Sequence, residues 1–130
     1  MNKEQFIHVD EYGHKRYYSD REMKIKHRED GPAIEGADGS KAWWVDGKIH
    51  REDGPAIEYA DGAKSWYVNG ELHREDGPAI ERANGDKWWY IDGRRLSEDE
   101  FNKRMNPVEL TLEDIAEKFD VSVDQLKIKK

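Results

Sequence analysis

The chain carries a near-copied block of 23 residues three times, beginning at His27, His50 and His73. Each block opens with the sequence HREDGPAIE and continues with a Gly-containing turn, a lysine, an aromatic cluster and a second turn. A unit of this length cannot bury a core of its own, so successive units are expected to stack on one another. Such a stack favours a binding platform over an enzyme.

Asp-Gly or Asn-Gly pairs recur every seven or eight residues between Asp30 and Gly93. They predict tight hairpins, because both central residues of a type I′ turn need positive φ. About five residues remain for each strand. The sequence therefore predicts a mainly β fold, an antiparallel meander of stacked β-hairpin repeats with roughly seven to nine strands, and a short C-terminal helical segment.

The repeat pattern divides the chain into three predicted parts. Residues 1–26 are expected to form a degenerate N-terminal capping repeat, in which Tyr17-Tyr18 stand where the first full copy has Trp43-Trp44. Residues 27–95 hold the three 23-residue hairpin repeats. Residues 96–130 change in composition and are expected to form a helical tail.

Three helix starts are predicted within that tail. Ser97 and Glu100 have the spacing of a capping box, which opens a short helix to about Arg104. A second, amphipathic helix is expected from Thr111, and another capping box opens at Ser122. We expect this tail to cover an edge or a face of the open sheet.

Composition excludes several classes of protein. The 130-residue chain has no cysteine, which removes disulfide staples and thiol chemistry, and no apolar run long enough to cross a membrane. Its net charge is −7, with 29 acidic against 22 basic residues, so nonspecific binding to nucleic acid is not expected. Five Trp and six Tyr at repeated positions argue against disorder. We expect a cytoplasmic protein that does not interact with membranes.

Alternation within the aromatic strands predicts two rows of rings that project to opposite sides of the sheet. One row holds Trp43, Trp66 and Trp89, and the other holds Trp44, Tyr67 and Tyr90. One of the two rows is expected to make the core, joined by Ile34, Ile57 and Ile80 from the neighbouring strands. The other row either packs under a helix or is offered to a partner.

The repeated His, Arg, Glu and Asp of HREDGPAIE invite a catalytic or metal-binding interpretation. Three copies of one environment do not supply the pair of differently tuned groups that acid–base catalysis needs. Equivalent imidazoles also lie too far apart, roughly 10 to 14 Å, to share one ion. We therefore predict no catalytic, cofactor or metal residues. Arg is expected to pair with Asp or Glu, His to pack on a ring, and Asp side chains to bond turn amides.

We expect the residues that determine partner specificity to lie in one aromatic row and at the positions where the three copies differ. The variable positions are Gly36, Tyr59 and Arg82, then Ala42, Ser65 and Trp88, then Lys48, Glu71 and Arg94. Trp, Tyr and Arg dominate interface hot spots. The predicted partner-binding residues are Trp44, Tyr59, Tyr67, Arg82, Trp88, Tyr90 and Arg94.

The sequence W-Y-V-N-G-x-x-H-R-x-D-G-P-A, carried by residues 27–95, resembles the MORN-like hairpin repeats of phage and prophage proteins. The chain departs from the usual Y-x-G-x-x-x-x-G-x-G pattern by carrying HREDGPA. The resemblance implies a ladder of stacked hairpins and an origin in a mobile element, with no defined activity.

Together these features predict a small cytosolic protein-binding module that binds a host protein through an aromatic sheet face and modulates or inhibits it, and the resemblance implies that it is a phage or prophage accessory protein. One alternative is a sponge that sequesters a small nucleotide or sugar. A second alternative is a DNA-binding regulator that uses the C-terminal helices. The tail offers few groove-reading side chains, which disfavours nucleic acid as a partner. Exposed sheet edges allow a homo-oligomer.

Overall fold

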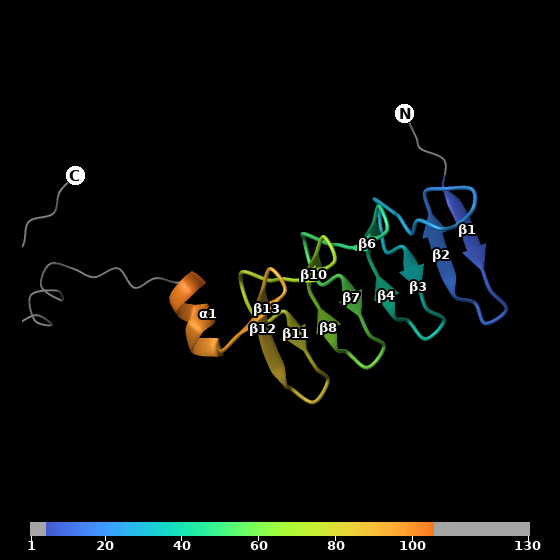
Figure 1. The fold of residues 1–130 in the computed structure, drawn as a ribbon. Helices are drawn as coiled ribbons and strands as arrows, with labels where there is room; N and C mark the ends of the chain where they lie inside the picture. Colours follow the sequence, from blue (N-terminus) through green and yellow to red (C-terminus); the bar gives the residue numbers. More distant parts are fainter. Residues whose placement is uncertain (1–4, 106–130) are drawn as a thin grey trace, which may run out of the picture.

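The protein is a row of antiparallel hairpins that ends in one helix (Figure 1). The computed structural model describes residues 5–105. In this part of the chain, nine strands form one sheet in the order β1-β2-β3-β4-β7-β8-β11-β12-β13, and two further pairs, β5-β6 and β9-β10, stand as separate hairpins. All pairings are antiparallel. The predicted mainly β meander is confirmed.

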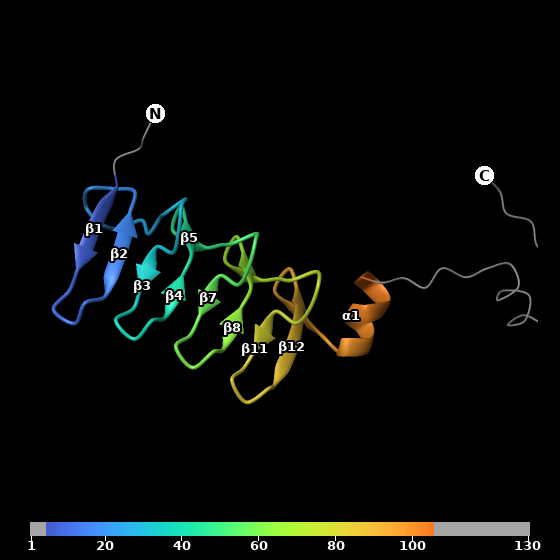
Figure 2. The same ribbon diagram turned by 180° about the vertical axis from the view of Figure 1, so that it is seen from behind.

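The strands are short. The nine of the main sheet are β1 (Phe6–Val9), β2 (Lys15–Tyr18), β3 (Ile34–Glu35), β4 (Lys41–Ala42), β7 (Ile57–Glu58), β8 (Lys64–Ser65), β11 (Ile80–Glu81), β12 (Lys87–Ile91) and β13 (Arg94–Leu96). The separate hairpins pair β5 (Trp44–Val45) with β6 (Lys48–Ile49), and β9 (Tyr67–Val68) with β10 (Glu71–Leu72). Figure 2 shows these hairpins along one long edge of the row, opposite the turns that join β3 to β4 and β7 to β8.

The Asp-Gly and Asn-Gly pairs adopt three different conformations rather than one. The pairs that begin at Asp46, Asn69 and Asp92 have positive φ at both residues and make the expected tight turns. In the turns after β3, β7 and β11, only the glycine has positive φ, because a three-residue loop needs one left-handed residue. The pairs within HREDG show no positive φ at all. Only three of the nine pairs are therefore type I′ turns.

Cross-strand partners share a face of the sheet, and this register defines two surfaces. Ile80 lies opposite Trp88, and Trp88 alternates with Trp89 along β12, so Trp88 and Tyr90 project together. We call this side the tyrosine face; its rows are Ile34, Ile57 and Ile80, then Ala42, Ser65 and Trp88, then Trp44, Tyr67 and Tyr90. The other side is the arginine face; it holds Trp43, Trp66, Trp89 and the HREDG corners.

Neither aromatic row forms a closed core. Among the described residues no large side chain is fully buried, and Ala33, Ala56 and Ala79 are the side chains with no exposed surface. A single-layer sheet leaves both faces half-exposed, so the prediction that one row becomes a core was wrong. The three isoleucines lie on the same face as Trp44, Tyr67 and Tyr90, and all six side chains remain partly exposed.

The helix α1 (Glu98–Met105) packs against β12 and β13 at the C-terminal end of the row. Its capping box is confirmed, because Glu100 N–H donates to Ser97 Oγ at 3.1 Å and Ser97 N–H donates to Glu100 Oε1 at 3.4 Å. Phe101 of α1 is 3% exposed. Between residues 5 and 105 no helix has the length and apolarity needed to cross a membrane. The helices predicted from Thr111 and Ser122, and the DNA-binding alternative that depends on them, lie outside the described residues.

Candidate functional site

The arginine of each HREDG corner is stacked on an aromatic ring. The guanidinium carbon of Arg51 lies 3.8 Å from the centroid of the Trp43 ring. Arg28 on Tyr17 and Arg74 on Trp66 repeat this arrangement at 4.0 and 3.8 Å. A cation over a ring contributes about 0.5 to 2 kcal/mol, depending on its exposure. The repeated arginine therefore joins one hairpin unit to the next.

Hydrogen bonds hold the edge of each stacked guanidinium. Arg51 Nε donates to Asp53 Oδ1 at 2.9 Å, and its Nη1 donates to the carbonyl oxygen of Pro55 at 3.0 Å. In the third corner the hydrogen bond from Arg74 lowers the pKa of the Asp76 carboxyl below its ordinary value. The predicted pairing of Arg with Asp is confirmed.

The repeated histidines connect successive turns. His50 Nδ1 accepts a hydrogen bond from the backbone N–H of Asn69 at 2.9 Å, and His27 and His73 accept equivalent bonds from Asp46 and Asp92. Among residues 5–105 the ring contact found is between Tyr12 and His14 and involves none of these three histidines, so the prediction that His packs on a ring was wrong. Asn69 N–H lies at the start of a type I′ turn and is satisfied by the imidazole nitrogen of the preceding corner, which fixes Nδ1 as an acceptor.

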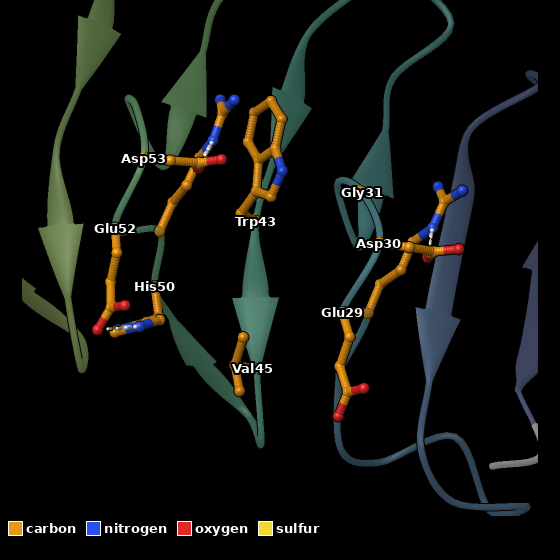
Figure 3. A pocket seen from close by; sticks show the side chains of 10 residues that line it. Glu29, Asp30, Gly31, Trp43, Val45, His50, Glu52 and Asp53 are labelled. Atoms are coloured by element: carbon orange, nitrogen blue, oxygen red, sulfur yellow. Dashed lines mark hydrogen bonds and ion pairs between the residues drawn. The ribbon is translucent and has the colours of Figure 1, made fainter. Parts of the chain in front are cut away.

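Hollows lie between neighbouring corners on the arginine face (Figure 3). The one between the first two corners has a volume of about 650 Å³, with Trp43 and Val45 between them and Glu29 and Glu52 at its sides. Both carboxylates are mostly exposed. No group of three or more potential metal ligands occurs among residues 5–105. These hollows repeat along the chain because the corners repeat.

A different groove lies on the tyrosine face, and we call it the tyrosine groove. Its volume is about 570 Å³, and its lining includes Tyr59, Ser65, Tyr67, Ile80 and Arg82. Three predicted partner-binding residues thus meet in one place, from β9, from the turn after β7 and from the turn after β11. Part of its lining, namely Tyr59, Ser65, Tyr67 and Arg82, stands at positions where the three copies differ, whereas Lys64, Ile80 and Glu81 are the same in every copy.

Two phenols of this groove, Tyr59 and Tyr67, lie near a third, Tyr90, which is outside its lining. Burial raises the pKa of the Tyr67 phenol above its ordinary value of 10.0, and the nearby Tyr59 and Tyr90 phenols raise it further. Tyr59 is 47% exposed and lines the groove together with the partly buried Tyr67. The groove therefore presents one exposed ring beside one partly buried ring.

Cations flank the aromatic row at both ends of the tyrosine face. The guanidinium carbons of Arg82 and Arg95 lie 4.5 and 5.9 Å from the ring centroid of Trp88. At the other end, Lys26 Nζ lies 5.2 Å from the ring centroid of Trp44. The predicted residues Trp44, Trp88 and Tyr90 thus lie on the same face as the groove.

The structure separates Arg94 from the other predicted partner-binding residues. Arg94 lies opposite Ile91 and therefore projects from the arginine face, whereas Arg95 lies opposite Tyr90 on the tyrosine face. Sequence reasoning missed Arg95. The signal was present, because a two-residue turn at Asp92-Gly93 fixes which residues face each other across the hairpin.

Comparisons with protein-family models, with curated proteins and with solved structures found no match to this chain. What its faces bind is therefore inferred from their geometry and charge.

Proposed function

We propose that this chain is a small protein-binding module that holds a partner protein on its tyrosine face. The observation that carries the proposal is the tyrosine groove, which gathers Tyr59, Tyr67 and Arg82 at positions where the repeats differ. Within residues 5–105 no second layer of structure covers this face. Tyr, Trp and Arg contribute most to binding when they are desolvated at an interface.

The contacts on the arginine face indicate a structural role for that face, which leaves partner binding to the tyrosine face. Its His and Arg side chains make one set of contacts three times, and these contacts connect the repeats to one another. A repeated environment supplies no contrast between an acid and a base, so the proposal includes no catalytic step. The resemblance of the repeat to MORN-like phage proteins adds that the partner is a host protein, which the module modulates or inhibits.

The test is affinity capture from bacterial lysate with the wild type and a Tyr59→Ser/Tyr67→Ser variant. We expect the variant to lose the proteins that the wild type captures, because its groove no longer offers two rings. A Tyr12→Ser/Lys41→Ser variant is the matched control, since Tyr12 is 71% exposed and Lys41 projects from the arginine face. Circular dichroism melts verify that both variants fold. Identical captured proteins in all three samples would contradict the proposal.

A second function, capture of a small nucleotide or sugar, is favoured by the size of the groove. About 570 Å³ falls within the range of known small-ligand sites, and Tyr67 and Arg82 could stack on and hydrogen-bond such a ligand. A thermal-shift panel of nucleotides and sugars tests this alternative. It predicts a rise in melting temperature for the wild type that Tyr59→Ser removes. No shift with any ligand of the panel would exclude those ligands.

A further inference from the structure

Acidic side chains are distributed unevenly between the two faces of the sheet. The chain has 29 acidic residues, yet no strand position of the tyrosine face, from β1 to β13, is Asp or Glu. The acidic strand residues are Glu35, Glu58, Glu71 and Glu81, and the pairing register places all four on the arginine face. The strand positions of the tyrosine face therefore offer aromatic rings and cations without carboxylates. Two carboxylates do line the tyrosine groove, but both have partners: Asp61 accepts a hydrogen bond from Ala63 N–H at 2.9 Å, and Glu81 pairs with Arg74 at 3.8 Å.

Two arginines on this face are not engaged by carboxylates. Arg82 and Arg95 are exposed, and within residues 5–105 neither has a carboxylate oxygen within 4.0 Å. The corner arginines differ, because each is paired with the Asp two residues later. Glu98 lies with Arg95 around the hollow beside Trp88 but forms no ion pair with it.

The cation–π contacts with the Trp88 ring, at 4.5 Å for Arg82 and 5.9 Å for Arg95, prepare these two side chains for binding. A guanidinium that lies over a ring keeps its N–H groups at the edge, where they can meet a planar carboxylate in a bidentate pair. The ring also restricts the arginine side chain, which reduces the entropy lost when a partner orders it. Arg82 approaches Trp88 from the β11 side and Arg95 from the β13 side.

We propose that Arg82 and Arg95 receive the carboxylates of an acidic protein segment whose apolar side chains lie in the tyrosine groove. The proposal rests on the protein-binding function and names the chemistry of the partner. Charge complementarity favours an acidic segment at this end of the face. Nucleic acid fits less well, because the net charge of −7 and the exposed carboxylates of the other face repel an extended polyanion.

The experiment selects binders from a random-sequence peptide library displayed on phage, with the full chain as bait. We expect enriched peptides to carry more Asp and Glu than the starting library, next to apolar or aromatic residues. One enriched peptide, labelled with a fluorophore, is then compared with its copy in which every Asp and Glu is changed to Asn or Gln. We expect binding of the amide copy to be at least about tenfold weaker, and binding of the acidic peptide to weaken as salt is raised.

Three single-residue variants test which arginines bind the carboxylates of the acidic peptide. Arg82→Gln and Arg95→Gln are each expected to weaken binding of the acidic peptide about tenfold or more, in line with the loss of a charge-assisted hydrogen bond. Arg94→Gln is the matched control, because Arg94 is an exposed arginine on the same strand that projects from the other face. Equal weakening by all three variants would show a general charge effect and would overturn the assignment.

The outcomes also separate this inference from the proposed function. Enrichment of neutral or basic peptides, or no enrichment, overturns the acidic partner even if Tyr59→Ser/Tyr67→Ser still abolishes capture from lysate. Loss of acidic-peptide binding in Arg82→Gln and Arg95→Gln, with Arg94→Gln unchanged, establishes the inference. If the lysate proteins are captured equally by the groove variant, the proposed function fails on its own test.

Discussion

At the scale of single residues, position 54 requires glycine because of the nearby Arg51 side chain and not because of its own backbone conformation. A Cβ on Gly54 would lie 2.9 Å from the guanidinium carbon of Arg51, and the φ of Gly54 is not in the left-handed region. The same closeness recurs at Gly31 and Gly77. We expect Gly54→Ala to push the guanidinium away from Trp43 and to lower the free energy of unfolding by about 1 kcal/mol. Urea denaturation measures this change.

Removal of Arg51 should reverse the sign of that effect. In an Arg51→Leu background the added methyl group meets no guanidinium, and alanine restricts the unfolded chain more than glycine does. Gly54→Ala is then expected to be neutral or to stabilise by up to about 0.5 kcal/mol. If Gly54→Ala lowers the free energy of unfolding equally in the wild type and in Arg51→Leu, the glycine is needed for a reason other than the guanidinium.

Tyr67 provides a residue-scale prediction that depends on pH. Its pKa is raised by burial and by the nearby Tyr59 and Tyr90, so the neutral phenol is favoured in the folded state. The stabilisation is complete below the ordinary pKa of 10.0 and is lost as pH rises through the higher folded value. We expect urea midpoints measured from about pH 8 to pH 11 to fall less steeply in Tyr67→Phe than in the wild type. Tyr12→Phe, at a 71% exposed position, should follow the wild-type curve; if it matches Tyr67→Phe, the groove is not the cause.

At the scale of elements, each separate hairpin depends on the corner that precedes it. The β9–β10 turn donates Asn69 N–H to His50 Nδ1, and Gly70 N–H donates to the carbonyl oxygen of Ile49 at 2.8 Å. We expect His50→Phe to lower stability by about 1 kcal/mol, because an amide loses its acceptor. His50→Asn, whose side-chain oxygen can accept the same bond, should recover part of the loss. Hydrogen exchange at Asn69 should speed up in His50→Phe; unchanged exchange would contradict the assigned bond.

The elements also show which features the sequence could predict. Hairpin number, strand direction and the capping box of α1 follow from local signals, namely turn dipeptides and Ser97 with Glu100. The conformations of the HREDG pairs do not, because Gly54 is placed by a contact with Arg51 and a ring from the preceding repeat. The contact of His50 with a turn 19 residues later is equally non-local.

At the scale of the whole molecule, the candidate site was predictable only in part. The rings at Tyr59 and Tyr67 were indicated by alternation and by variation between copies, and the structure brings them into one groove. The choice between Arg94 and Arg95 required the register across the last hairpin. The expectation of a core row failed because a single-layer sheet buries little more than Ala33, Ala56 and Ala79 completely.

A stack of equivalent units should tolerate the loss of one whole unit. Deletion of residues 50–72 joins Ile49 to His73, so that Arg74 can stack on Trp43 as Arg51 did, and the backbone ladder can continue from β4 to β11. Because the stability of such a stack is approximately a sum of units and their interfaces, we expect the shortened chain to fold with a melting temperature about 5 to 10 °C lower. Circular dichroism and heat denaturation measure this. Deletion of residues 50–60 removes about half a unit, breaks the register and should unfold the chain; if both deletions unfold it, the repeats are not interchangeable units.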